Sequence, residues 1–299
     1  MKQVFALILF VTIVPMAFPG SVVLKKAWVK KYKDRATIDA TFIVDHAHKS
    51  PNNAAKDGDE HVAGRAAKEI GLPLVAEVVN AGQPFGAPAL TPVHSAESSG
   101  QSVSVSGAWR LWFEHPADSQ TQFATFPKAT NTNPDHSFEI HPMTKFDGVD
   151  LTKTFVPIPG FAPYDAEKAF ASYEKQTLSI QGTQTAVTLT AKKSGYNYVQ
   201  FTMRMLGRPK KLDDGGYAVL ADVEGTTDEA VAEKVRMIFV PGTPPCTRVS
   251  NGKMGAGDEL EVIGIPRVNL NAVWTVISAP GSKQKTTKLP YELIIVAIK

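Results

Sequence analysis

An interval of 157 residues recurs between matching turns of this chain, and it constrains the fold more than any other feature of the sequence. The turn Asp57-Gly58 lies 157 positions before Asp214-Gly215 (214 − 57 = 157). At the same interval, and without a gap, Gly100-x-x-Val-x-Val-x-Gly-x-x-Arg110 overlies Gly257-x-x-Leu-x-Val-x-Gly-x-x-Arg267. Gly, Pro and Asp recur at any strand end, so two unrelated β-rich halves are the alternative. The agreement of separate windows at one interval favours a duplicated unit.

Apolar and polar residues alternate through most of the chain, as in Thr37–Val44, Val187–Thr190 and Tyr198–Met203. This is the pattern of half-buried strands. Both copies then read as strand, Asp-Gly turn, strand, short helix or loop, strand, Pro-rich loop, strand and closing strand. That order suits a small five-stranded barrel of the OB type, in which closure removes exposed sheet edges. We therefore predict a mainly β protein with two related small OB-like β-barrels, a tandem duplication, and a short helical connector.

Helical spacing of apolar residues is confined to three short segments. Apolar residues three and four apart predict a helix over 164–175, and Gly182 marks a hairpin that follows it. Thr226-x-x-Glu229 matches a capping box and predicts a second helix over 229–235. A third short helix is predicted over 63–70.

The first twenty residues have the layout of a secretory signal peptide, with Lys2 before an apolar run over Val4–Met16. This run is shorter than the ~20 residues of a membrane-spanning helix, so we expect export to the periplasm or the extracellular space. The alternative is an uncleaved N-terminal anchor, because six basic residues follow between Lys25 and Arg35. The predicted organisation is a signal peptide over 1–20, a first His-rich barrel over 21–150, a connector with helix and hairpin over 151–192, and a second barrel over 193–299.

The composition excludes several classes of protein. The 32 basic and 29 acidic residues give a net charge of +3, too small to indicate a nucleic-acid or membrane partner by itself. The single cysteine, Cys246, excludes an intrachain disulfide and a cysteine-cluster metal site. The sequence contains no nucleophile elbow, phosphate-binding glycine loop, two-histidine zinc helix or nicotinamide fingerprint.

All seven histidines lie in the first copy, between His46 and His141, and the second copy has none. At the interval of 157, the partners of His61, Glu139 and His141 are Ala218, Val296 and Ile298. If the copies share a fold, this difference marks what was added for function or lost from a copy kept for stability. The first barrel is where a site is expected.

Two strands of the first copy bring imidazoles and carboxylates to one face. If Phe138 and Ile140 point into the barrel, then Glu139 and His141 share the opposite face. In the segment Asp57-Gly-Asp-Glu-His61-Val62, Val62 points into the barrel by the same rule, so Asp59 and His61 share the opposite face. Imidazole and carboxylate groups together suit zinc, manganese or a similar divalent metal. The candidate metal ligands are His61, Glu139, His141, Asp59 and Asp57. The alternative is a hydrogen-bonded structural network beside tight turns.

The strand Ala108–His115 offers a second candidate surface. Its alternation places Trp109 on the core side and Arg110 with Trp112 on the other side. An outward arginine and tryptophan can stack a base or a sugar, as on OB sheets that bind single strands. The alternative is that Trp112 packs under a loop. The candidate ligand-binding residues are Arg110, Trp112, Glu114, His115 and His136.

The element Asp57-Gly-Asp-x-His61, followed later by the strand Glu139-Ile-His-Pro142, resembles a group of exported bacterial proteins, mostly uncharacterised, that carry a DGDxH element and an EIHP strand. The resemblance covers residues 36–146. It departs at the usual Gly-Trp before EIHP, which is Ser137-Phe138 here. The resemblance implies a small β-barrel and export, and it implies no activity.

Two functions remain open from the sequence. The first hypothesis is an exported, non-catalytic binding or structural module that engages an extracytoplasmic polymer or a protein partner. The alternative is a metal-dependent hydrolase, phosphodiesterase or nuclease-like, with its site in the first barrel. In that case a bound metal makes hydroxide available near neutral pH.

Overall fold

The computed structural model describes residues 19–225, 229–281 and 284–299. The expected signal peptide over 1–20 lies outside the described residues except for its last two positions. No helix in the described part of the chain is long and apolar enough to cross a bilayer.

The first barrel closes five strands around an apolar core. Their order is β4-β3-β2-β5-β7, and a parallel pairing of β4 with β7 completes the circle. A helix stands between the third and fourth strands and packs Val93 and Ala96 into the core. The elements are β2 (Thr37–Ala47), β3 (Glu60–Arg65), β4 (Pro73–Val78), η1 (Ala87–Ala89), α2 (Leu90–Ser99), β5 (Ser102–His115) and β7 (His136–Phe146), with the short β6 (Gln120–Thr121) and β8 (Val149–Asp150) beside them.

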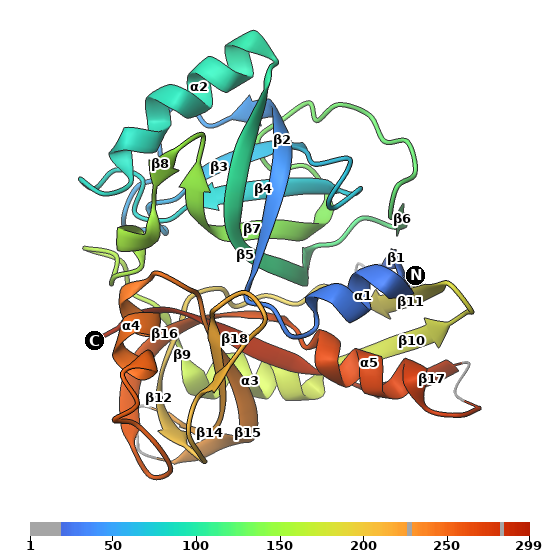
Figure 1. Ribbon diagram of the computed structural model, residues 1–299, viewed down its shortest axis with the longest axis vertical. Helices are drawn as coiled ribbons and strands as arrows, with labels where there is room; N and C mark the ends of the chain where they lie inside the picture. The colour runs from blue at the N-terminus through green and yellow to red at the C-terminus, as the bar shows by residue number, and fades with distance from the viewer. Residues whose placement is uncertain (1–18, 226–228, 282–283) are drawn as a thin grey trace, which may run out of the picture.

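The second barrel repeats this topology strand for strand (Figure 1). Its parallel closure joins β15 to β18, and α4 occupies the place of η1 and α2. The elements are β12 (Val199–Met205), β13 (Lys210–Lys211), β14 (Tyr217–Glu224), β15 (Ala230–Phe239), α4 (Pro244–Ser250), β16 (Glu259–Val268) and β18 (Tyr291–Ile298). The expected fold, two OB-like barrels in a mainly β protein, is therefore confirmed.

In register, the interval of 157 holds for the second and fourth strands of each copy and fails at the others. In the first strands, Ile38 pairs with Gly107 and Val199 pairs with Gly264, so the interval there is 161 (199 − 38 = 161). Four elements of the first copy, β3, β4, η1 and β5, begin 157 residues before β14, β15, α4 and β16 (217 − 60 = 157). Within the third strands, however, Glu77 of β4 corresponds in register to Ile238 of β15, an interval of 161 (238 − 77 = 161).

In the closing strands, Arg110 pairs with Glu139 and Arg267 pairs with Glu292, an interval of 153 (292 − 139 = 153). Strand register follows the hydrogen-bonded pairs and not the residue count, because the loops differ in length.

This register corrects two correspondences expected from the sequence. The counterpart of Glu139 is Glu292 and not Val296, so a glutamate at this position is common to both copies. The counterpart of His141 is Ile294 and not Ile298 (294 − 141 = 153).

Two of the three predicted helices are strands or turns. The segment 229–235 lies mostly in β15, with residues 226–228 outside the described part, and the segment 63–70 begins in β3 and ends in a turn. Each of these strands has pairing partners on both sides, β14 and β18 in one case and β2 and β4 in the other. Barrel closure therefore overrides the local helical spacing.

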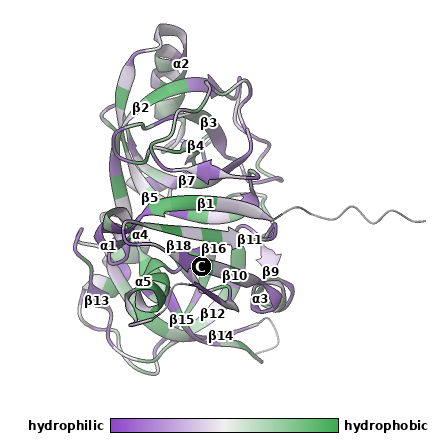
Figure 2. Ribbon diagram, turned by 90° about the vertical axis from the view of Figure 1, so that its right-hand side faces the viewer, coloured by the Kyte–Doolittle hydropathy of each residue, from purple (hydrophilic) through white to green (hydrophobic). Residues whose placement is uncertain are grey.

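A third sheet lies beside the two barrels and draws on both ends of the chain. Its strand order is β17-β10-β11-β1-β6. The hairpin β10-β11 comes from the segment between the barrels, and β10 packs against α5 (Figures 1 and 2). The elements are β1 (Gly20–Lys25), α1 (Lys26–Tyr32), η2 (Thr152–Thr154), β9 (Tyr164–Asp165), α3 (Ala166–Lys175), β10 (Thr177–Gly182), β11 (Ala186–Ala191), α5 (Leu270–Ser278) and β17 (Gln284–Lys288).

Two buried arginines join the barrels in a reciprocal way. Arg110 of β5 donates its Nε hydrogen to the carbonyl of Pro266 at 2.9 Å. Its counterpart Arg267 of β16 donates from Nη1 to the carbonyl of Trp109, also at 2.9 Å. Residues 109 and 266 are themselves counterparts, so the two contacts are related by a local pseudo-twofold axis. Arg267 also lies over the Trp109 ring, 3.5 Å from its centroid, and pairs with Glu292 at 2.6 Å.

Removing one of these arginines is expected to destabilise the protein strongly. Arg267→Leu deletes the ion pair with the buried Glu292 and leaves backbone carbonyls without donors. Breaking a buried pair in this way costs about 3 kcal/mol or more. The matched control, Arg204→Leu, removes an exposed pair with Glu224 and is expected to cost less than about 1 kcal/mol. Urea unfolding followed by tryptophan fluorescence measures both, and equal losses would contradict the central role of Arg267.

Candidate functional site

The acids and histidines singled out in the sequence converge on the outer face of the first barrel, where it meets the second. Asp59 directly precedes β3, Glu77 lies in β4 and His141 lies in β7. These strands are neighbours, because β3 pairs with β4 and β4 pairs with β7. One ligand atom from each of the three side chains lies within 4.8 Å of the other two. The three residues, which we call the junction cluster, are all buried.

The imidazole of His141 is held between carboxylates on both of its nitrogens. Nδ1 lies 3.3 Å from Oε2 of Glu139 and 3.4 Å from Oε2 of Glu77. Nε2 lies 2.9 Å from the Tyr198 hydroxyl and 3.5 Å from Oδ2 of Asp59. The Tyr198 hydroxyl donates to Asp59. Because Tyr198 stands directly before β12, the cluster includes a group from the segment that enters the second barrel.

Glu139 has a strong cationic partner of its own. Arg110 donates from Nη1 to Glu139 and from Nη2 to Glu114 at 2.9 Å. His136 Nε2 lies 3.2 Å from the second oxygen of Glu139. The charge of Glu139 is thus balanced within the first barrel, and this carboxylate is already engaged on both oxygens.

The electrostatics of the cluster follow from burial and from these neighbours. Burial raises the pKa of Asp59 to about 7, against the opposing effect of His141. Burial alone would lower the pKa of His141, but the carboxylates of Glu77 and Asp59 raise it to about 10. Burial likewise opposes ionisation of Glu139, but the Arg110 guanidinium holds the pKa of Glu139 well below its usual range. Glu139 therefore stays ionised, whereas burial disfavours the ionised form of Asp59.

The remaining predicted ligands lie at the edge of the cluster. His61 Nε2 is 3.5 Å from Oε2 of Glu77, and its ring stacks on His48 with centroids 4.7 Å apart. Asp57 accepts hydrogen bonds from the Asn52 side chain at 2.9 Å and from the Asp59 amide at 3.2 Å. His61 therefore touches the cluster through Glu77, and Asp57 shapes the turn that delivers Asp59.

The expected stacking surface on β5 is not exposed. Arg110 and Trp112 are buried, at 0% and 1% exposure. The Trp112 ring meets Tyr173 of α3 edge-on, with centroids 5.5 Å apart. This corrects the interpretation of the pair as an outward platform for a base or sugar, because the outer face of β5 is covered by α3 and by the second barrel. His115 stacks on His136 at 5.4 Å beside the same network.

Sequence reasoning missed Glu77 and Tyr198. Glu77 lies in a strand whose Leu74, Ala76 and Val78 are buried in the barrel core, so the alternation rule applied there would have placed Glu77 outside. Nothing in the sequence near Tyr198 signals a contact with the first copy. In the second barrel the positions of His61, Glu77 and His141 hold Ala218, Ile238 and Ile294.

These three counterparts belong to an apolar cluster between the barrels. The same outer face is therefore polar in the first copy and apolar in the second.

Each barrel also has an open cleft beside its second and third strands and the loop between its fourth and fifth strands. In the first barrel a cleft of about 550 Å³ is lined by β3, β4 and residues 117–135. In the second a cleft of about 810 Å³ is lined by residues 206–213, β14, β15 and residues 269–272. OB folds bind oligomers at this face.

Comparisons with known proteins give only a distant similarity to solved structures. No family model and no curated protein matches the chain. Among solved structures it is similar to the wild-type single-stranded DNA binding protein from Thermus aquaticus, with 8% identity, a TM-score of 0.22, and 88% of this chain and 90% of that chain covered. A deletion mutant of the same protein gives 7% identity, a TM-score of 0.22, and 88% and 91% coverage.

At this TM-score the chains do not superimpose closely. The class of the protein, a tandem OB-like barrel protein, rests on the strand order and closure described above.

A buried acid next to the cluster generates a pH prediction. Glu60 lies between Asp59 and His61 but is wholly buried, and neither of its carboxylate oxygens has a hydrogen-bond partner in the described structure. Burial, aided by Glu97, raises the pKa of Glu60 from 4.5 to about 8. Folding therefore favours the protonated form, so Glu60 makes stability fall as pH rises from about 4.5 to about 8.

Glu60→Gln removes this dependence. We expect the variant to be more stable than the wild type at pH 9 by about 1 kcal/mol or more, and to show little advantage at pH 4. Thermal unfolding across this pH range measures the difference. A constant difference between the two proteins at every pH would contradict the prediction.

Proposed function

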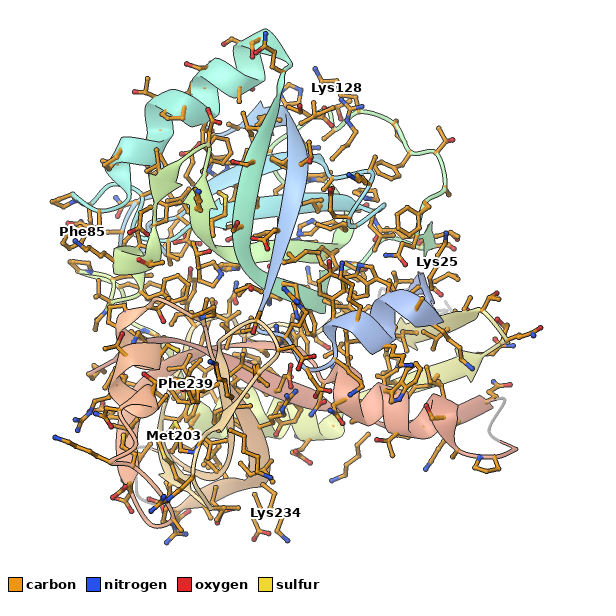
Figure 3. All side chains as sticks on the ribbon, in the orientation of Figure 1. Lys25, Phe85, Lys128, Met203, Lys234 and Phe239 are labelled. Carbon is orange, nitrogen blue, oxygen red and sulfur yellow. The ribbon has the colours of Figure 1, made fainter. Side chains whose placement is uncertain are left out.

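We propose that this protein is a non-catalytic binding module whose second barrel holds an extended anionic polymer in its cleft. The carrying observation is a group of four exposed cations around that cleft, Arg208, Lys210, Lys211 and Lys234. Within the described residues, no carboxylate lies within 4.0 Å of the side-chain nitrogens of any of them. Lys234 stands at the outer end of the second barrel, away from the first (Figure 3). Unpaired cations focused on one cleft attract a polyanion.

The lining of this cleft favours recognition by charge. Its aromatic residue, Tyr291, is half-buried, and its hydroxyl donates to Glu174 at 2.8 Å. Stacking of successive bases needs exposed rings, so a nucleobase platform is not indicated here. Leu206 and Leu220 are 41% and 48% exposed beside the cations and offer apolar contact to the body of a polymer.

The position of the junction cluster supports binding over hydrolysis. Asp59 and His141 have no exposed surface, and Glu77 is 6% exposed. A hydrolytic centre must admit both a scissile bond and an attacking water to contact distance. The metal-dependent hydrolase is therefore the weaker proposal for this chain, and the open cleft of the second barrel is the stronger locus of function.

Charge reversal in the cleft tests the proposal. Lys210→Glu with Lys211→Glu is expected to weaken binding of fluorescein-labelled polyphosphate at least tenfold, because two attractive contacts become repulsive. Fluorescence anisotropy at several salt concentrations measures this, and the double variant should also show a shallower salt dependence. The matched control, Lys49→Glu with Lys68→Glu, makes the same change in net charge on the exposed surface of the first barrel.

Labelled poly-glutamate and oligo(dT) of similar length, used in parallel, distinguish a general polyanion site from one selective for phosphate. Equal binding by both double variants, or no binding of any of the three polymers by the wild type, would refute the proposal.

A further inference from the structure

We propose that Asp59, Glu77 and His141 form a binding site for one divalent cation of the zinc or manganese type, with a structural role at the junction of the two barrels. This site is separate from the cleft of the second barrel and does not depend on the polymer proposed above.

The donor set suits such an ion. Two carboxylate oxygens and one imidazole nitrogen, drawn from three neighbouring strands, lie within 4.8 Å of one another. Zinc takes imidazole nitrogen and carboxylate oxygen at about 2.0 to 2.2 Å, and manganese accepts the same donors. Ligands at these distances lie roughly 3 to 4 Å apart around the ion. Small side-chain rotations therefore suffice to form the site.

The cluster holds two carboxylates, and the His141 imidazole between them supplies at most one positive charge. In the described structure the only basic side chains within 4.0 Å of the Asp59 and Glu77 carboxylates are the imidazoles of His141 and His61. No lysine or arginine of that part pairs with either acid, whereas Glu139 has Arg110. Burying a carboxylate without a matching cation is strongly unfavourable. One divalent cation neutralises both acids at once.

An unpartnered oxygen points to a ligand independently of this charge count. Asp59 is wholly buried, and its Oδ1 atom has no hydrogen-bond partner in the described structure. Native proteins almost always satisfy such an atom, so its presence calls for a specific reason. A metal ion bound by Asp59 supplies that reason.

The second copy shows that the fold does not require polar groups here. Ala218, Ile238 and Ile294 occupy the positions of His61, Glu77 and His141 and form part of an apolar cluster. The first barrel therefore buries side chains that can bind a metal at positions where the second barrel has apolar packing. A specific task for these side chains explains the difference.

The surroundings of the cluster give the ion a structural role. The Tyr198 hydroxyl contacts both Asp59 and His141, so an ion at their side chains tightens the first barrel against the chain that enters the second. His61 contacts Glu77 at 3.5 Å and acts as a positioning residue for that ligand.

Metal content of the full chain is the first test. After dialysis against zinc or manganese and removal of excess ion, mass spectrometry of the purified protein should find about one equivalent bound. With free metal at about one hundred times Kd, the melting temperature should exceed that in chelator by about 5 °C or more. Less than a tenth of an equivalent of either ion, with no thermal shift, overturns the proposal without any variant.

Substitutions then locate the ion. Asp59→Asn and Glu77→Gln are each expected to weaken metal binding at least tenfold. In chelator, Asp59→Asn should be as stable as the wild type or more stable, because it removes a fully buried charge whose Oδ1 atom has no partner in the described structure. In saturating metal the wild type should be the more stable of the two. This reversal is not expected of a purely hydrogen-bonded network, so equal destabilisation under both conditions overturns the proposal.

A control variant addresses adventitious binding by surface histidines. Glu97 lies 3.5 Å from His46 and 3.8 Å from His94 on an exposed face of the first barrel. Glu97→Gln should retain one equivalent of metal and the full thermal shift, and loss of both would overturn the assignment to the junction cluster. The variant Lys210→Glu with Lys211→Glu should also retain its metal, so failure of polymer binding and failure of metal binding are distinguishable.

Discussion

The reciprocal contact of Arg110 and Arg267 is the interaction on which the rest of the structure depends. Each guanidinium binds a backbone carbonyl of the opposite barrel, so the strands β5 and β16 are fixed against each other at one crossing point. Both arginines are fully buried at this crossing. Arg110 meets Glu139 on β7 there, and Tyr198 then reaches across to Asp59 and His141. The burial of the junction thus follows from the contacts that these two equivalent arginines make.

Duplication explains the symmetry of this contact, and divergence explains what surrounds it. Both copies keep an arginine and a glutamate paired across the fourth and fifth strands. Only the first copy adds imidazoles and further acids to its outer face, and the second fills the matching positions with alanine and isoleucine. The second copy also has four exposed cations around its cleft, and within the described residues none of the four has a carboxylate within 4.0 Å. The polar groups that distinguish the first copy therefore lie at the junction, and the cations that distinguish the second copy lie at its open cleft.

The sequence predicted the fold better than it predicted the site. Turns at a constant interval, together with alternating strands, were enough to establish two OB-like barrels, and helical spacing correctly indicated α3. The closing strand was misaligned because register depends on partner strands that a residue count does not include. Burial of Arg110 and Trp112 could not be predicted for the same reason, since a second barrel and α3 cover a face that looks exposed within one copy. The alternation rule could have predicted the outward position of Glu77, whereas no sequence pattern predicts the contact of Tyr198 with the first barrel.

The mixed origin of the third sheet has a consequence for how the chain is made and divided. β1 enters it from the N-terminal side, β17 from the loop before the last strand, and both pair with the β10-β11 hairpin. This layer cannot be completed until nearly the whole polypeptide has left the ribosome. Separating the barrels would also leave an unpaired β edge on each fragment, and such an edge is prone to aggregation. The two halves, although copies of one domain, are therefore expected to depend on each other. We do not expect them to be expressed separately or exchanged as independent modules.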